Sequence, residues 1–354
     1  MTLSKDNITP SLAKDIRELI AKLSEHEHGT LVKRALSVLL RIAEEEIDRL
    51  DWKILTATLE DLEQGVKTFY PYRHIRKVTI FGSSRLSPQS SEYRLAVEFA
   101  RSITQFGFMV LTGAGGGIMQ AGNEGAGPKH SFGLNIQLPF EQSANPFIAD
   151  DPKLINFKYF FTRKLFFMRE SDAVALFAGG FGTQDEVFET LTLSQTGKYG
   201  PCPLVLIDEP GGDYWQIWNE HNQKNFLQRG LISPEDFSLY TVTDNLAHAC
   251  NVIRNFYCVY HSSRYVGDLF VMRLNSELSD EQVDQLNDDY SDILVKETIC
   301  KSAALPCEKG DETESLPRLV FHFDQRNLGR LYKMINQINQ YSPCLPVESH
   351  PEWK

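Results

Sequence analysis

Two glycine-rich loops contain the residue pattern best suited to chemistry. The first covers residues 112–119 (TGAGGGIM), the second covers residues 178–186 (AGGFGTQDE), and each lies between an apolar run and a helix-like stretch. Glycine has no Cβ atom, so the amides of such loops can approach an anion closely. The helix that follows adds its positive N-terminal end, and phosphate is the expected ligand. Tight packing of a strand against a helix is the alternative explanation of the glycines.

A basic pair lies between the two loops. Arg163 and Lys164 occur within residues 160–168 (FFTRKLFFM), at a predicted helix start with many aromatic neighbours. A buried cation without a partner is costly, so this pair should meet an anion. The anion is either a bound ligand or a nearby carboxylate, Glu170 or Asp172, and the residues alone leave both possibilities open.

The second loop ends in two acids at the start of a predicted helix. Thr183 is the expected N-cap, with Asp185 and Glu186 in the first turn. An acid in this position often only complements the helix dipole. Its neighbourhood of glycines and the basic pair makes Glu186 a candidate reacting group as well.

Two common phosphate motifs do not fit the chain. The dinucleotide fingerprint requires a third glycine where this sequence has Ile118, and the glycine loop here follows the second strand rather than the first. The only Gly-Lys pair is followed by Tyr199, whereas the Walker loop requires Ser or Thr. The sequence therefore argues against hydride transfer and against ATP hydrolysis of the P-loop type.

Short apolar runs alternate with helix-length amphipathic stretches from residue 77 onward. This alternation predicts a doubly wound, Rossmann-like parallel sheet of the α/β class, with ligands beyond the carboxyl ends of the strands. The predicted strands are 78–82, 108–113, 131–138, 173–179 and 203–208, and the predicted helices lie near 90–106, 116–127, 161–171, 183–196 and 213–229.

The distribution of glycine divides the chain into three regions. Of 23 glycines, two precede residue 82 and three follow residue 264. We expect a helical N-terminal extension over 1–72, a central Rossmann-like domain with both glycine-rich loops over 73–262, and a small α+β subdomain with a polar tail over 263–354. In the first region, Leu36, Leu39, Leu40, Ala43, Ile47 and Leu50 recur at helical spacing and predict one apolar stripe. In the third, 269–275 and 317–323 resemble strands, and 277–292 resembles an acidic helix.

Composition excludes several classes of partner. Lys and Arg total 36 against 47 Asp and Glu, a net charge of −11, which argues against a nucleic-acid binder. No apolar run approaches the roughly 20 residues of a membrane span, and the first residues lack an apolar signal core, so we expect a cytoplasmic protein. The six cysteines show no Cys-x-x-Cys pair and are expected to be free thiols. We expect neither a metal nor a cofactor.

Five motifs in order resemble the LOG (Lonely Guy) family, whose members are often labelled lysine decarboxylase-like. They are FGSSR (81–85), TGAGGGIM (112–119), GLNIQLPFEQ (133–142), FTRKLFFM (161–168) and AGGFGTQDE (178–186), and the resemblance covers roughly residues 76–260. It implies a Rossmann-like homodimer or higher homo-oligomer with sites near the subunit boundary. It also implies hydrolysis of the N-glycosidic bond of a nucleoside 5′-monophosphate, which releases the base and ribose 5-phosphate.

The resemblance also implies roles for individual residues. The catalytic pair falls on Arg163 and Glu186. The sequence departs from the family at Ala178, where members usually have Pro, and at Ala114, where they commonly have Gly. The implied substrate- and phosphate-binding residues are Gly82, Ser83, Gly115, Gly116, Gly117, Met119, Lys164, Gly179, Gly180, Gly182 and Thr183.

Two other functions fit parts of the same pattern. A nucleotide-sensing regulator would keep the pocket without much catalysis and would use the terminal regions to signal occupancy. An amino-acid decarboxylase would need a lysine that forms a Schiff base with pyridoxal phosphate, and Lys164 is the conceivable candidate.

Overall fold

The computed structural model describes residues 18, 22–23, 28–138, 143–342 and 344. The last four residues of the motif at 133–142 therefore lie outside the described residues. The chain divides into two compact units, Met1–Glu60 and Asp61–Lys354.

The described part of the N-terminal unit is mainly helical. It contains α2 (Gly29–Glu44) and the first part of α3 (Arg49–Phe69). The single apolar stripe predicted from Leu36 to Leu50 is wrong, because α2 ends at Glu44 and Glu45 is extended, with φ −88° and ψ 150°. Three consecutive acids at 44–46 oppose the negative end of the helix dipole, which favours a helix end there.

A seven-stranded sheet forms the centre of the second unit, in the order β4-β3-β2-β1-β5-β6-β7 with every neighbouring pair parallel. All residues of β1, β2, β3, β5 and β6 are buried, as a sheet covered on both faces requires. The strands are β1 (Lys77–Phe81), β2 (Met109–Thr112), β3 (Ser131–Ile136), β4 (Leu154–Phe157), β5 (Ala173–Phe177), β6 (Leu204–Ile207) and β7 (Tyr240–Thr243).

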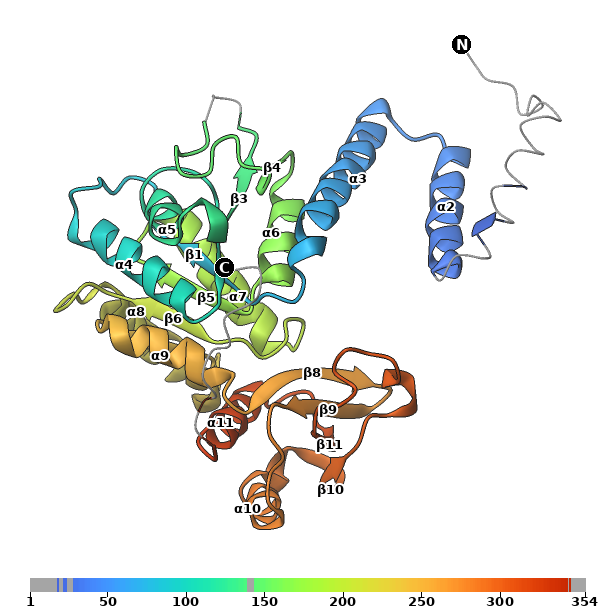
Figure 1. The fold of residues 1–354 in the computed structure, drawn as a ribbon, viewed down its shortest axis with the longest axis vertical. Coiled ribbons are helices and arrows are strands. Elements are labelled where there is room, and N and C mark those ends of the chain that lie inside the picture. Colours follow the sequence, from blue (N-terminus) through green and yellow to red (C-terminus); the bar gives the residue numbers. More distant parts are fainter. Residues whose placement is uncertain (1–17, 19–21, 24–27, 139–142, 343, 345–354) are drawn as a thin grey trace. The chain divides into compact units, whose positions relative to one another are not determined.

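Helices cover both faces of this sheet (Figure 1). One face packs against α4 (Ser91–Gln105), α5 (Ile118–Ala126) and α9 (Leu246–Phe256). The other packs against α6 (Phe160–Glu170), α7 (Phe181–Gln195) and α8 (Tyr214–Asn222). The predicted doubly wound α/β fold is thus confirmed.

Some central elements differ from the expectation. The sequence did not predict the four-residue strands β4 and β7 or helix α9. The helix expected over 213–229 is α8 followed by a π-helical turn at Gln223–Leu227.

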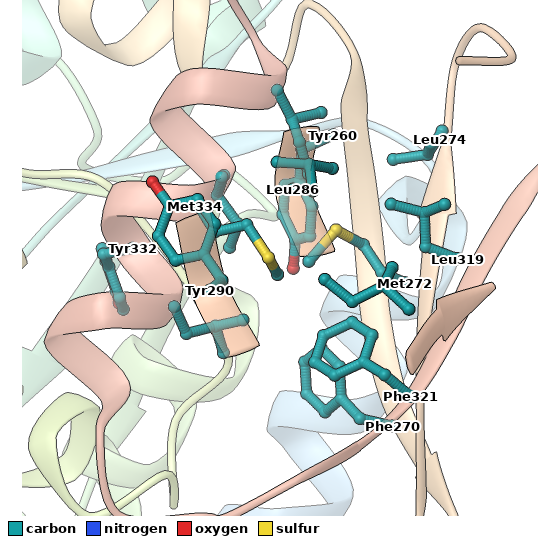
Figure 2. Close-up of a cluster of buried hydrophobic side chains, with 14 of the residues drawn as sticks. Tyr260, Phe270, Met272, Leu274, Leu286, Tyr290, Leu319, Phe321, Tyr332 and Met334 are labelled. Atoms are coloured by element: carbon teal, nitrogen blue, oxygen red, sulfur yellow. The ribbon is translucent and has the colours of Figure 1, made fainter. Parts of the chain in front are cut away.

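The C-terminal region forms a second, antiparallel sheet in the order β10-β11-β9-β8. Its strands are β8 (Tyr260–Val266), β9 (Leu269–Leu274), β10 (Leu294–Ser302) and β11 (Arg318–Phe323), and its helices are α10 (Asp280–Tyr290) and α11 (Leu328–Ile338). Figure 2 shows their shared core, in which Phe270, Met272 and Phe321 of the sheet lie near Leu286 of α10 and Met334 of α11. The predicted α+β subdomain is confirmed, while the domain boundaries proposed at 72 and 262 stay predictions.

The expectation of six free thiols is wrong for one pair. Cys258 and Cys344 form a disulfide, with their Cα atoms 4.4 Å apart. The two residues are 86 positions apart and meet only in the folded chain, so their spacing gave no signal. Cys202 and Cys250 are free and buried, and Cys300 and Cys307 are free and exposed.

Candidate functional site

A cavity of about 900 Å³ opens where the carboxyl ends of β1, β2 and β5 meet. The order of strands in the sheet reverses between β1 and β5, and ligands of doubly wound sheets bind at such a point. The cavity thus lies where the fold alone predicts a binding site. Nine predicted site residues line it, namely Gly82, Ser83, Met119, Arg163, Gly179, Gly180, Gly182, Thr183 and Glu186.

Four predicted site residues are not among those that line the cavity: Gly115, Gly116, Gly117 and Lys164. Gly117 has a packing role, because its φ is +61° and a Cβ atom there would lie 2.2 Å from the Ser83 carbonyl oxygen. From the first glycine loop, Gly113 and Met119 face the cavity instead. A Cβ atom at Gly113 would lie 2.2 Å from Nη2 of Arg163, so this glycine leaves room for the guanidinium group.

Ser83 joins the two glycine loops through its backbone. Its N–H donates to the carbonyl oxygen of Ala178 at 3.0 Å, and its own carbonyl oxygen accepts from the N–H of Ile118 at 3.0 Å. The loop after β1 therefore lies between the loops after β2 and β5 and is bonded to both.

The second loop presents the N-terminus of α7 to the cavity. The helix begins at Phe181 with Gly180 as N-cap, so the prediction of Thr183 as N-cap is wrong, and Asp185 and Glu186 lie beyond the first turn. The two glycines at 180 and 182 leave open space beside their Cα atoms. The first N–H groups of a helix have no partner within it, so this end can bind an anion.

A tyrosine hydroxyl tethers the same loop. Tyr214 of α8 donates from its hydroxyl to the carbonyl oxygen of Gly179 at 2.5 Å, and the hydroxyl accepts from Nε2 of Gln184 at 2.7 Å. These bonds restrain a loop that begins at Ala178 rather than at the more rigid proline that the resemblance led us to expect. No sequence signal pointed to Tyr214.

Arg163 extends from α6 into the cavity. Its Nε donates to the carbonyl oxygen of Leu134 at 2.6 Å, and Nη2 donates to that of Gly113 at 3.3 Å. Burial lowers the pKa of the guanidinium group to about 10, although Glu186 opposes this shift. The group stays charged at neutral pH.

The carboxylates considered as alternative partners of the basic pair are engaged elsewhere. Glu170 lies 3.8 Å from Nζ of Lys77 and 3.0 Å from Nη1 of Arg169. Asp172 pairs with Arg76 at 3.1 Å. The structural salt bridge that would have explained Arg163 by packing alone is therefore not formed.

Asp61 holds the start of α6 and was not found by sequence reasoning. Its buried carboxylate accepts from the N–H groups of Lys158 and Tyr159 and from the hydroxyl of Thr162. These partners lie 97 to 101 residues further along the chain, so only the fold reveals the contact. Through it, Asp61 positions the helix that carries Arg163.

Glu186 is largely buried, and one of its carboxyl oxygens makes no hydrogen bond within the described residues. Its side chain is 13% exposed, and among the described residues its Oε2 has no hydrogen-bond partner. Burial raises the pKa of its carboxyl to about 7, with Lys164 opposing and Glu189 adding to the shift. A carboxyl in a cavity that keeps one oxygen free of hydrogen bonds and titrates near neutral pH has the properties of a catalytic or substrate-binding group.

The described residues contain neither a cluster of metal ligands nor a membrane-spanning helix. No group of three or more His, Cys, Asp or Glu side chains among them is arranged to hold a metal ion. None of the helices in this part of the chain is long and apolar enough to cross a membrane.

Fold and site together define a Rossmann-like α/β protein with a cavity at the strand switch point, lined by both Glu186 and Arg163. Residues 116–253 match the family model described as "Possible lysine decarboxylase". This is the LOG-like family that the motifs resemble, so the match agrees with the resemblance over these residues. The match supports a nucleotide-related enzymatic role in broad terms.

Several solved structures resemble about half of the chain. TM1055 is 21% identical with a TM-score of 0.37, and the match covers 51% of this chain and 98% of that one. A molybdenum cofactor binding protein from Rippkaea orientalis is 17% identical, with a TM-score of 0.37 and coverages of 51% and 95%. DNA processing protein A from Helicobacter pylori is 17% identical, with a TM-score of 0.34 and coverages of 50% and 79%. No curated protein sequence matches the chain.

Proposed function

We propose that the protein hydrolyses the N-glycosidic bond of a nucleoside 5′-monophosphate and releases the free base and ribose 5-phosphate. The observation that carries this proposal is the buried carboxyl oxygen of Glu186, which has no hydrogen-bond partner among the described residues and lies in the same cavity as Arg163 and the N-terminus of α7. An anion site and a carboxylate within one cavity suit a substrate that has a phosphate at one end and a reacting sugar carbon further along.

The phosphate end is assigned to the second glycine loop. The N–H groups at the start of α7 and the helix dipole favour a dianion there, and Arg163 adds a fixed positive charge. Binding of this remote group holds the sugar in place, so binding energy contributes to positioning at the reacting bond.

The reacting end is assigned to Glu186. Cleavage of the C1′–N bond builds positive charge on the ribose, and an ionised carboxylate close to C1′ stabilises that charge or orients the attacking water. The water supplies a hydroxyl group to C1′, and its remaining proton is transferred to the departing base. Arg163 neutralises the phosphate and keeps the substrate against Glu186.

Amino-acid decarboxylation, suggested by the family's description, fits the residues poorly. Lys164 would have to form a Schiff base with pyridoxal phosphate, which requires a neutral amine facing the cavity. Lys164 is not among the lining residues, and its Nζ lies 2.7 Å from Asp185 and 2.8 Å from Glu189. Burial favours the neutral amine, but the hydrogen bond to Asp185 and the negative charges of Glu189 and Glu186 outweigh it and raise the pKa of Lys164. No described residue that lines the cavity is a lysine.

The test is a panel of nucleotides. The purified protein is incubated with AMP, GMP, CMP, UMP and IMP, and the free base and ribose 5-phosphate are measured. We expect both products from at least one nucleotide and a loss of roughly 100-fold or more in kcat for Glu186→Gln with binding retained. Glu98→Gln, an exposed acid on α4, is the control. Binding without release of base would instead support a nucleotide-sensing regulator.

We also propose that the active form is a homodimer. The motif resemblance implies one, and apolar side chains are exposed on α6 and at the start of α7, where Phe160 and Phe181 also line the cavity. Phe181 is 97% exposed, and Phe160, Phe161 and Leu165 of α6 are about half exposed. Clusters of exposed aromatic and aliphatic side chains are common at interfaces between subunits.

A further inference from the structure

Lys164 lies in different surroundings from those expected of a phosphate ligand. The motif resemblance assigned it to the substrate, yet its side chain points to the acidic side of α7. Its Nζ is 2.7 Å from Asp185 Oδ2, 2.8 Å from Glu189 Oε2 and 3.9 Å from Glu186 Oε2. The ammonium group thus has three carboxylates around it, all from one helix.

The three carboxylates repel one another without a counter-charge. Asp185 and Glu189 are four residues apart on α7, and Glu186 and Glu189 are three apart, so all three lie on one side of the helix. Lys164 is 18% exposed, so solvent screens its interaction with the equally buried Glu186 less than at the surface. Its position on the neighbouring helix α6 places one positive charge at the centre of this acidic cluster.

We propose that Lys164 is a positioning residue that acts through Glu186 rather than on the substrate: its ammonium group is the counter-charge of the cluster Asp185, Glu186 and Glu189. This inference rests on the proposed catalytic role of Glu186. Lys164 keeps that carboxyl ionised and fixes the face of α7 that carries it.

The titration of the surrounding groups agrees with this role. Burial raises the pKa of the Glu186 carboxyl. The negative charges of Glu189 and Asp185 raise this pKa further, and the positive charges of Lys164 and Arg163 on α6 lower it. Arg85, from the loop after β1, is a further charged residue on the same cavity. Of the groups that lower the pKa of Glu186, Lys164 has the larger effect.

The kinetic test compares Lys164→Met with Lys164→Arg. Since ionised Glu186 is required, kcat/KM of the wild-type protein should fall as the pH drops below about 7. In Lys164→Met this acid limb should move upward by about one pH unit, because a close opposite charge has been removed. Lys164→Arg keeps the charge and should retain the wild-type limb, and KM at pH 9 should stay close to wild type in both.

A phosphate-binding lysine would behave differently. Lys164→Met would then raise KM for the nucleotide and weaken inhibition by ribose 5-phosphate by the same factor at every pH, with the acid limb unmoved. That result overturns the proposal. Glu189→Gln provides a shift of opposite sign, since loss of a neighbouring negative charge should move the limb to lower pH.

A measurement that needs no turnover separates this inference from the proposed function. Protein labelled with ¹³C at the glutamate carboxyl carbons is titrated by NMR, and the Glu186 resonance is identified by its loss in Glu186→Gln. The midpoint should rise by about one pH unit in Lys164→Met and stay in place in Lys164→Arg. If no nucleotide is hydrolysed, the proposed function fails while this titration still decides the role of Lys164, and an unmoved midpoint in Lys164→Met overturns it.

Discussion

The buried carboxyl of Glu186 should reduce the stability of the fold while it serves the site. Its pKa is about 7 in the folded protein against an ordinary value of 4.5. Between these two values the folded state holds the proton more tightly than the unfolded state, so stability falls as the pH rises. The free energy of unfolding is lowered by the full amount above about pH 7 and is not lowered below about pH 4.5.

Glu186→Gln should therefore be more stable than the wild-type protein at pH 8. Glutamine resembles the protonated carboxyl and avoids the penalty, which amounts to about 3 kcal/mol at most. The difference should disappear near pH 4.5, as measured by urea unfolding at several pH values. Glu98→Gln, whose side chain is exposed, should show no such trend, and an equal stability of Glu186→Gln and wild type at pH 8 would contradict the assigned pKa.

A second prediction concerns Ala114, which stands where related sequences commonly have glycine. Its φ is +62° and it is buried, with its N–H donating to Thr112 Oγ1. The left-handed conformation costs an L-residue about 1–2 kcal/mol, while glycine loses about 0.5–1 kcal/mol through its freer unfolded chain. Ala114→Gly should thus raise the free energy of unfolding by about 0.5–1 kcal/mol in a urea titration. Ala121→Gly, inside α5, is the control and should lower it.

Residue types and spacing predicted much of the candidate site but not its contacts. The glycines at 179, 180 and 182, together with Arg163 and Glu186, form one cavity as the motifs indicated. The sequence placed Lys164 on the ligand because it cannot show which side of α6 faces α7. Nothing in the sequence indicated the roles of Asp61 and Tyr214, because their hydrogen-bond partners are far away along the chain.

At the scale of elements, the attachment of α6 to Asp61 determines where Arg163 lies. Three donors at the start of α6 share this single carboxylate, and its removal would leave the N–H groups of Lys158 and Tyr159 without that acceptor.

Asp61→Ala should lower the free energy of unfolding by about 2–3 kcal/mol. It should also lower kcat/KM, because the helix start that positions Arg163 loses its anchor. Glu60→Ala changes the exposed neighbouring position on α3. It should change the free energy of unfolding by no more than about 0.5 kcal/mol and leave kcat/KM close to the wild-type value. Normal unfolding of Asp61→Ala in urea would contradict the anchoring role.

The two strands that escaped prediction share a physical reason. β4 and β7 have four residues each, which is too short for a period to show, and both lie at the edges of the sheet. The buried central strands were predictable because their apolar runs are continuous. The end of α2 at Glu44 was not predicted, because apolar residues continue at helical spacing beyond it although the helix stops there.

At the scale of the whole molecule, the proposed dimer makes a simple prediction about mass. Phe161→Glu places a charge among the exposed aromatic side chains of α6 and should convert the dimer into monomers near 40.3 kDa in sedimentation velocity. Ile217→Glu alters an equally exposed apolar residue on α8 and should leave the mass unchanged. A wild-type protein that sediments as a monomer at all concentrations would refute the dimer.

The backbone of Ser83 has a consequence for any attempt to redesign this protein. The N–H of Ser83 bonds to Ala178 and its carbonyl oxygen bonds to Ile118, so the two glycine-rich loops are coupled through this residue and should move together. A substitution chosen to reshape one of them for a larger or smaller ligand will be transmitted to the other. Libraries that vary both segments and the short link between them together should therefore yield more working variants than libraries that vary either one alone.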